Sequence, residues 1–195
     1  MAQYDDESIV VYQAYRPAIG NFAAQNGYFG GEFSLNRMSW IKPNFLWMMY
    51  RCGWGTKEGQ EVILAIRLMR SAFDTILAKA VESSYNRASY PDQSAWKAAI
   101  AKSDVRLQWD PDHDPTGKSL PRRAIQLGLR GETLALYSRD WIISIEDVSD
   151  FVAEQRAYTQ PSLWPHLLTP TEQPYPVQDL AVAARLGLSA SVSDL

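Results

Sequence analysis

The chain has 195 residues, of which 46% are hydrophobic and 21% charged, and its formal net charge at pH 7 is -3. This length predicts one compact domain, and the small net charge excludes a general basic field that would hold duplex nucleic acid without sequence preference. The single cysteine, Cys52, excludes an internal disulfide framework and a cysteine-rich zinc site.

The chain shows no targeting or membrane-spanning signal. It begins MAQYDDESIV, which is polar and acidic and lacks the basic start of a secretory leader. No stretch reaches the roughly 18 apolar residues that span a bilayer. We therefore expect a cytoplasmic protein with no membrane partner.

The first predicted elements are a strand and a short helix. Residues 9–15, IVVYQAY, are β-branched and aromatic, which favours a strand. Pro17 then sets the backbone for a helical first turn over residues 17–26, and Asn26-Gly27 ends that helix.

An aromatic and cationic segment follows at residues 36–55, NRMSWIKPNFLWMMYRCGWG. Pro43 divides it into an extended part, residues 37–42, and a helix over residues 44–52 that is apolar on nearly all sides. Such a helix should be buried, with Gly53 as its left-handed terminator.

The middle of the chain predicts a buried strand, a helix and a connection. Residues 62–66, VILAI, form a continuous apolar run expected of a strand covered on both faces. Ser71 and Asp74 have capping-box spacing at the start of a helix with one apolar face. Residues 82–103 are polar and read as a connection with a small helix.

Two further segments, residues 105–110 and 123–130, alternate apolar and polar side chains and predict half-buried strands. Gln108 and Gln126 share the polar phase, so two neighbouring strands would place both amides on one cleft floor. Arg123 has the apolar phase, and we expect it to have a buried acidic partner.

The last third of the chain adds shorter elements. ETLALY predicts a helical turn, WIISI a strand, and the segment after Asp147 a helix that this residue caps. Residues 159–176 contain five prolines and should be irregular. A short helix then ends at Gly187.

Strands and helices without a regular βαβ rhythm predict an α+β fold, with a mixed, mostly antiparallel sheet and packed helices. We expect one domain over residues 1–158 and an extension over residues 159–195 packed on it. Dinucleotide-fold, Walker, nucleophile-elbow and zincin motifs are absent. The acidic turn at residues 110–114 lacks the spacing of a calcium loop, so we expect no metal.

The segment at residues 36–55 has two interpretations. Its aromatic residues can be ordinary core, with Lys42 and Arg51 reaching the surface. Alternatively, Trp40 stacks a base while Arg37 and Lys42 meet phosphate, because an arginine fork suits phosphate and an indole suits a base.

Several long stretches resemble a family known only as domain of unknown function 4291. They are VYQAYRPAI, RMSWIKPNFLWMMYRCGWGTKEGQ, VRLQWDPDHD, RRAIQLGLRG and DWIISIEDVS, and they cover most of residues 9–150. The family name implies no activity.

A second resemblance concerns the opening, VYQA followed by AIGNFAAQNGYF, which looks like the start of ADP-ribosyltransferase-like domains. The resemblance implies that Gln13 occupies the position of the first-strand His or Arg and Ser39 the second segment. Gln126 or Glu132 would fall near the carboxylate of a later strand. Gln13 carries no charge, and Gln126 is not a carboxylate.

The leading hypothesis is an NAD-dependent ADP-ribosyl transferase with an unknown acceptor. Its predicted catalytic residues are Gln13, Gln126 and Glu132, and its predicted cofactor-binding residues are Tyr12, Arg16, Arg37, Ser39, Trp40 and Lys42. The alternatives are a non-catalytic RNA- or nucleotide-binding module, an enzyme that acts on RNA, and a structural protein whose tryptophans are core.

Overall fold

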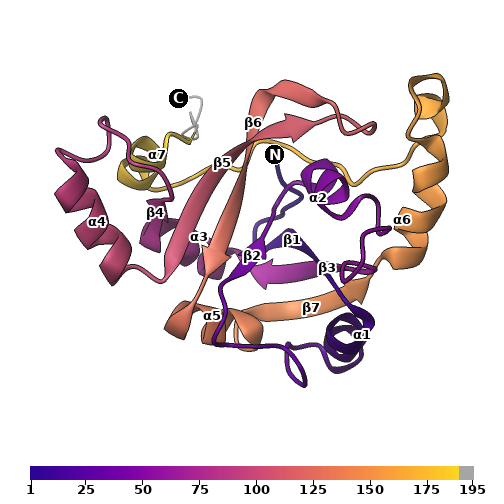
Figure 1. Ribbon diagram of the computed structural model, residues 1–195, viewed down its shortest axis with the longest axis horizontal. Helices are drawn as coiled ribbons and strands as arrows, with labels where there is room; N and C mark the ends of the chain where they lie inside the picture. The colour runs from indigo at the N-terminus through magenta and orange to yellow at the C-terminus, as the bar shows by residue number, and fades with distance from the viewer. Residues whose placement is uncertain (189–195) are drawn as a thin grey trace.

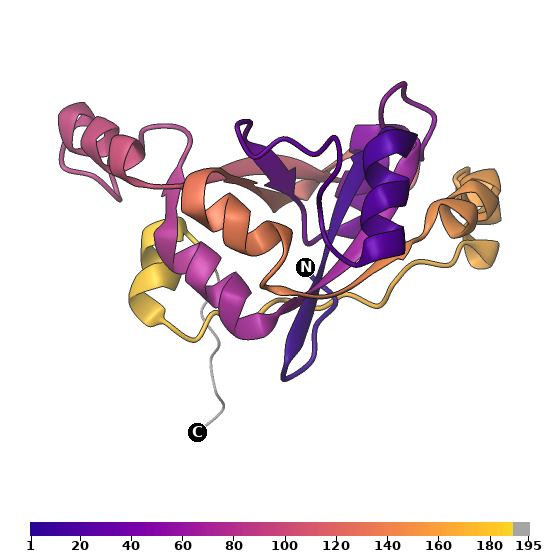
Figure 2. The same ribbon diagram turned by 90° about the horizontal axis from the view of Figure 1, so that it is seen from below.

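The computed structural model describes residues 1–188 and has the predicted α+β architecture (Figures 1 and 2). Its elements, in order, are β1 (Ser8–Tyr15), α1 (Pro17–Asn26), β2 (Ser39–Ile41), α2 (Phe45–Cys52), β3 (Val62–Met69), α3 (Arg70–Lys79), β4 (Ala80–Glu82), α4 (Gln93–Lys102), β5 (Val105–His113), β6 (Ser119–Leu129), α5 (Gly131–Ser138), β7 (Ile142–Asp147), α6 (Ser149–Gln155), the 3-10 helices η1 (Arg156–Tyr158) and η2 (Pro161–His166), and α7 (Leu180–Leu186).

The strands form two sheets. The first has the order β1-β3-β7 and is antiparallel, and the second has the order β2-β6-β5-β4, in which β4 and β5 are parallel. A bridge between Tyr12 and Lys42 joins the sheets, and the N–H of Tyr12 donates to the carbonyl of Lys42 at 2.7 Å. This bridge places the extended segment at residues 37–42 beside β1.

The β3 strand is covered on both faces, as its apolar run predicts. Leu64, Ile66 and Leu68 belong to the main core between the sheets and α3, whereas Ile63 belongs to a second core cluster under α2. The α2 helix is mostly packing, since Phe45, Met48, Met49 and Cys52 are among its buried residues. Asn44 caps its start, and Gly53 ends it in the left-handed conformation.

The predicted capping box at Ser71 is wrong. The α3 helix starts at Arg70 and has no side-chain cap, because β3 runs directly into it at Met69. Ser71 lies inside the first turn, and its carbonyl accepts the hydroxyl of Thr75. The carboxylate of Asp74 instead accepts a hydrogen bond from the hydroxyl of Tyr175 at 2.7 Å.

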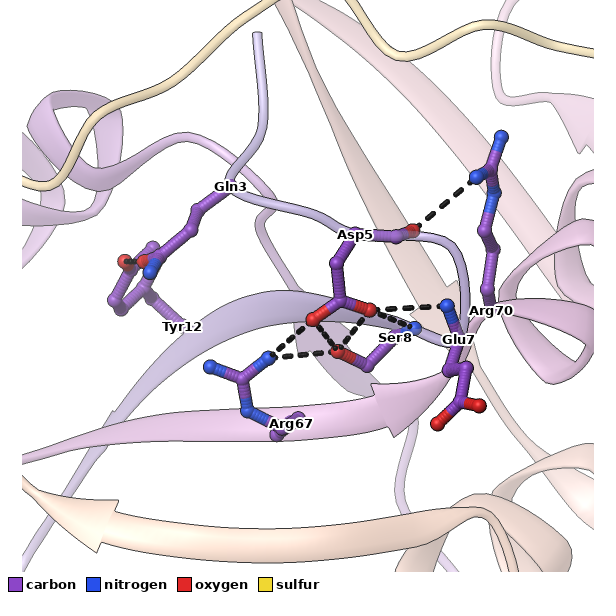
Figure 3. Close-up of polar contacts among 7 residues, drawn as sticks. All are labelled: Gln3, Asp5, Glu7, Ser8, Tyr12, Arg67 and Arg70. Atoms are coloured by element: carbon purple, nitrogen blue, oxygen red, sulfur yellow. Dashed lines mark hydrogen bonds and ion pairs between the residues drawn. The ribbon is translucent and has the colours of Figure 1, made fainter.

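The N-terminal turn is fastened to β3 by the cluster in Figure 3. The Asp5 carboxylate accepts hydrogen bonds from the backbone N–H and the hydroxyl of Ser8. It also forms an ion pair with Arg67, at 3.2 Å. Hydrogen bonding from Ser8 lowers the pKa of Asp5. The backbone carbonyl of Asp5 accepts from Arg70 at 3.1 Å. This cluster fixes where β1 begins.

The proline-rich tail crosses the domain from α6 to the edge at β4 (Figure 1). Its Gln173 pairs with Ala2 through two main-chain hydrogen bonds of 2.9 Å, and Arg185 in α7 donates to carbonyls of α3 and β4. These contacts place residues 159–188 of the extension on the same domain, and residues 189–195 lie outside the described part of the chain. The division at residue 158 stays a prediction. No helix within residues 1–188 is long and apolar enough to cross a membrane.

Glu172 links this tail to α2. Its carboxylate accepts the N–H of Phe45 at 2.6 Å and the side-chain amide of Asn44 at 2.7 Å. Burial raises the pKa of Glu172 to about 7, and the charge of Asp112 acts in the same direction. The hydrogen bond from Phe45, the N-terminal amine and Arg122 lower this pKa and only partly offset the effect of burial.

The tail contact should therefore make stability depend on pH. Between the unfolded pKa of 4.5 and the folded value of about 7, the folded protein holds a proton that the unfolded chain has released. The contribution of Glu172 to the free energy of unfolding is greatest below pH 4.5 and falls as the pH rises through 7. We expect a loss of about 3 kcal/mol over this range, because each pKa unit of difference corresponds to about 1.4 kcal/mol.

Urea denaturation of the wild type and of Glu172→Gln across this pH range measures the effect. Glutamine does not titrate, so the difference in unfolding free energy between the two proteins should change by that amount. An unchanged difference would show that Glu172 titrates normally.

Candidate functional site

A buried polar network lies between the two sheets, centred on Gln13. The amide nitrogen of Gln13 lies 2.8 Å from the hydroxyls of both Tyr15 and Ser39 and 3.0 Å from the carbonyl of Trp40. Its amide oxygen accepts the hydroxyl of Tyr137 at 2.6 Å. The hydroxyls of Tyr15 and Ser39 are 2.7 Å apart. One side chain thus connects β1, β2 and α5.

The alternation of β1 explains this arrangement. Ile9, Val11, Gln13 and Tyr15 share one face, on the side of the main core, whereas Tyr12 points to the other face. Because Gln13 is only 3% exposed, its amide needs internal partners, and the four contacts supply them. Ser39 comes within reach because β2 bridges to β1.

Two members of the network, Tyr15 and Ser39, line a cleft of about 420 Å³. The hydroxyl-bearing residues Tyr15 and Ser39 lie at its base, and Ile19, Phe33 and Met38 supply apolar surface. The charged lining residues are Arg16, Glu32 and Arg37. The cleft therefore combines neutral hydrogen-bonding groups, an aromatic ring and charge.

Two arginines at this cleft differ in their state. Arg16 forms an ion pair with Glu32 at 2.5 Å, and both side chains are more than half exposed. Such an exposed pair contributes little to stability. Arg37 is exposed and has no hydrogen bond or ion pair within the described part of the chain. Arg37 is thus the cation available to an anionic ligand.

The two tyrosines of the network are neutral at ordinary pH. Burial raises the pKa of Tyr15 to about 12, although its hydrogen bonds to Ser39 and Gln13 act in the opposite direction. Burial also raises the pKa of Tyr137. Both hydroxyls therefore remain protonated and can donate or accept hydrogen bonds.

A second set of predicted site residues lies on the polar face of the other sheet. Gln108 and Gln126 are paired directly across β5 and β6, and both amides donate to Asp110, at 2.9 and 2.8 Å. The two amides share one face, as the alternation predicts, but they do not line one cleft floor, since Gln108 lines a cleft at the β4 edge and Gln126 does not. Trp40 in β2 and Lys42, one residue after its end, follow the same alternation.

Lys42 is buried on this face. Its ammonium nitrogen lies 3.3 Å from the carbonyl of Trp40 and 5.1 Å from the ring centroid of Trp47. Burial, together with the charge of Arg51, lowers the pKa of Lys42 to about 8, and Asp110 partly opposes this. The Trp40 indole and the Met38 sulfur lie close over Gly128, where a Cβ atom would stand 2.6 Å from that sulfur.

The structure therefore does not bring all predicted site residues together. Arg16, Arg37 and Ser39 line the cleft, whereas Trp40, Lys42 and Gln126 do not. Gln13 is not a lining residue and reaches the cleft only through its hydrogen bonds to Tyr15 and Ser39. Neighbouring residues of a strand point to opposite faces, so the segment at residues 37–42 cannot present all its side chains to one ligand.

Two further predicted residues lie elsewhere. Tyr12 packs edge-on against Phe45, with centroids 5.4 Å apart, in the cluster under α2. Glu132 is exposed in the first turn of α5, and this helix reaches the network through Tyr137 instead. Tyr12 and Glu132 were assigned to the site from their positions along the chain, and a position does not show in which direction a side chain points.

The expectation of a buried acidic partner for Arg123 is wrong. The guanidinium of Arg123 lies 4.4 Å from the ring centroid of Trp109, and the neighbouring Arg122 instead pairs with buried Asp112 at 2.5 Å. A register shift at residues 111–113 of β5 accompanies this change of partner.

Sequence reasoning missed Tyr15, Glu32, Phe33 and Tyr137. Tyr15 follows Gln13 by two residues on a predicted strand, so the alternation could have identified it. The other three come from a loop and a distant helix, and no local pattern connects them with β1.

One comparison with known proteins identifies a relationship. A family model described as Domain of unknown function (DUF4291) matches residues 1–175. This range includes every residue of the cleft and of the Gln13 network. No curated protein matches the chain.

Proposed function

The chain belongs to the family described as Domain of unknown function (DUF4291), a description that names no activity, and we propose that the protein binds a nucleotide, preferentially NAD, in this cleft and transfers ADP-ribose to an acceptor. The observation that carries this proposal is the buried Gln13 network beneath a cleft in which Arg37 has no partner within residues 1–188.

Each part of the cleft suits a part of NAD. The hydroxyls of Tyr15 and Ser39 can bond ribose hydroxyls or the carboxamide, because a hydroxyl both donates and accepts. Phe33 offers an aromatic ring against which nicotinamide can pack. Arg37 is the group suited to the diphosphate, since a guanidinium binds phosphate oxygens in pairs.

In the proposed transfer, the bond between the nicotinamide nitrogen and C1′ of the ribose breaks, and nicotinamide leaves with the bonding electrons. The ribose carbon gains positive charge, and an acceptor nucleophile forms the new bond there and loses its proton. A carboxylate near C1′ would stabilise this charge. Glu32 is the carboxylate among the described lining residues, so we assign this role to it rather than to Glu132.

Calorimetric titration with NAD tests the binding. The wild type should bind one NAD, and Arg37→Ala should bind it at least about tenfold more weakly, because a charge-assisted contact to phosphate is lost. Arg87→Ala is the matched control, since Arg87 is exposed and does not line the cleft. Absence of heat with the wild type would refute NAD binding.

Release of nicotinamide tests the transfer separately. We expect slow release by the wild type and none by Glu32→Gln, which keeps the shape of the side chain but removes its charge. If the wild type binds NAD but releases no nicotinamide, the protein would be a nucleotide-binding module without transferase activity. In that case, quenching of tryptophan fluorescence by short RNA with steep salt dependence would favour the RNA-binding alternative.

A further inference from the structure

A mostly apolar cavity of about 230 Å³ lies between the core face of the second sheet, α3 and the tail that Figure 1 shows crossing the domain. Each of these elements supplies walls to it: Trp109 and Ile125 from the sheet, Phe73 and Leu77 from α3, and Tyr175 and Val177 from the tail. The cavity shares no lining residue with the cleft proposed for NAD. It is therefore a second, separate space in the fold.

The strand register places three of the lining side chains on one face of the second sheet. Trp109 pairs directly with Ile125 across β5 and β6, so these two side chains share a face. Arg123 lies two residues from Ile125 and has the same alternation. Its guanidinium carbon is 4.4 Å from the ring centroid of Trp109. This face thus brings two apolar side chains and one cation to the cavity.

The polar groups of the aromatic walls have partners outside the cavity lining. The indole N–H of Trp109 donates to the carbonyl of Leu186 at 3.2 Å, and the hydroxyl of Tyr175 donates to Asp74 at 2.7 Å. Neither acceptor residue lines the cavity. These bonds hold both rings in place and leave apolar surface to the interior. An apolar cavity of about 150 Å³ stays dry and accepts a benzene ring, so this larger one suits a hydrocarbon group.

Two neighbouring arginines line the cavity, and they differ in their state. Arg122 pairs with buried Asp112 at 2.5 Å and is therefore already neutralised. Arg123 is exposed, and its guanidinium has no ion pair or hydrogen bond within residues 1–188. The described lining residues include no Asp or Glu. Because Trp109 covers one face of the guanidinium, its N–H groups are left at the edges, where they suit a carboxylate.

We propose that this cavity binds a small carboxylate with an apolar body, of the size of a medium-chain fatty acid. The hydrocarbon chain lies between the sheet and the tail, and the carboxylate meets Arg123 at the surface. Such a ligand matches both features of the site, since its apolar part leaves water while its charge keeps a partner. The proposal does not depend on NAD binding.

Calorimetry of the full chain at neutral pH with butanoate, hexanoate and octanoate tests the apolar half of the site. Octanoate should bind at one site, and affinity should rise by about fourfold for each added methylene, because each one buries hydrocarbon in the cavity. 1-Octanol has the same apolar chain without the charge. It should bind about fivefold more weakly than octanoate, because it lacks the group that meets Arg123.

Arg123→Met tests the charged half. It should lower the affinity for octanoate to that for 1-octanol and leave the affinity for 1-octanol unchanged. Arg87→Met is the matched control, since Arg87 is exposed and does not line the cavity, and it should change neither.

Val177→Phe places the ligand within the cavity, because it adds a ring to the lining and should weaken both ligands by about tenfold. If this variant does not fold, Arg123→Met still decides, since Arg123 is exposed. The proposal would be overturned by absence of octanoate binding, by an affinity that does not rise with chain length, or by unchanged octanoate affinity in Arg123→Met.

Discussion

Replacing Gln13 by alanine is expected to lower the free energy of unfolding by about 3 kcal/mol, a large share of the stability of a domain of this size. The hydroxyl of Tyr137 would lose its acceptor while its side chain is fully buried. The carbonyl of Trp40 would lose one donor and keep the ammonium of Lys42 at 3.3 Å. The unpaired hydroxyl of Tyr137 costs about 1–3 kcal/mol and the other lost hydrogen bonds add to this, whereas Tyr15 and Ser39 keep their mutual hydrogen bond.

Urea denaturation followed by circular dichroism measures this loss. Tyr137→Phe is the matched partner, since it removes the hydroxyl that binds Gln13 and leaves no donor without an acceptor. It should cost about 1 kcal/mol, clearly less than Gln13→Ala. Gln126→Ala controls for the loss of a glutamine that is only partly buried. A loss for Gln13→Ala no larger than for Gln126→Ala would mean that the network does not hold the sheets together.

The same substitution should also remove the proposed NAD affinity. Gln13 holds the hydroxyls of Tyr15 and Ser39 in place at the base of the cleft. NAD affinity should therefore fall in Gln13→Ala and remain in Gln126→Ala. Unchanged affinity in a folded Gln13→Ala protein would place the nucleotide elsewhere.

Replacing Gly20 by alanine is expected to lower the free energy of unfolding, although helix propensity alone would raise it. Alanine in a helix interior is favoured over glycine by about 1 kcal/mol. However, a Cβ atom at Gly20 would stand 2.5 Å from both the Cβ and the Cγ1 of Val62 in β3. The Cβ of Val62 cannot rotate away, so α1 must move off the sheet. Overpacking costs about 1–3 kcal/mol, and we expect a net loss of about 2 kcal/mol.

Ala18→Gly in the same helix measures propensity alone, because Ala18 is exposed. It should cost about 1 kcal/mol, which gives the gain that Gly20→Ala would show without the clash. A higher unfolding free energy for Gly20→Ala would mean that α1 shifts at no cost. Since α1 carries Ile19 to the cleft and Arg16 precedes its first residue, a displaced helix should also weaken NAD binding.

The predictions that held were those in which neighbouring residues determine the structure. Asn44 caps the start of α2, Gly53 ends it, and Gly27 ends α1. These assignments were predictable because capping groups and left-handed glycines act within a few residues. The capping box failed because β3 continues directly into α3. Local spacing at Ser71 could not show that no separate helix start exists there.

The candidate site was only half predictable. Alternation correctly placed Gln108 and Gln126 on one face, since a strand has a period of two. Ser39 and Trp40 look like parts of one motif in the sequence, yet they face different surroundings. Glu132 and Tyr137 occupy the same helix, and only Tyr137 reaches Gln13.

The amino-acid sequence by itself determined the α+β class, the burial of α2 and β3, and the family, because composition, periodicity and matching residues are properties of the chain. Only the tertiary structure decided which polar groups meet. Ser39 and Tyr137 lie 26 and 124 positions after Gln13 in the chain. They meet it because a bridge joins the two sheets and because α5 carries Tyr137 to Gln13. Such long-range pairing depends on how the elements pack together, which no local pattern records.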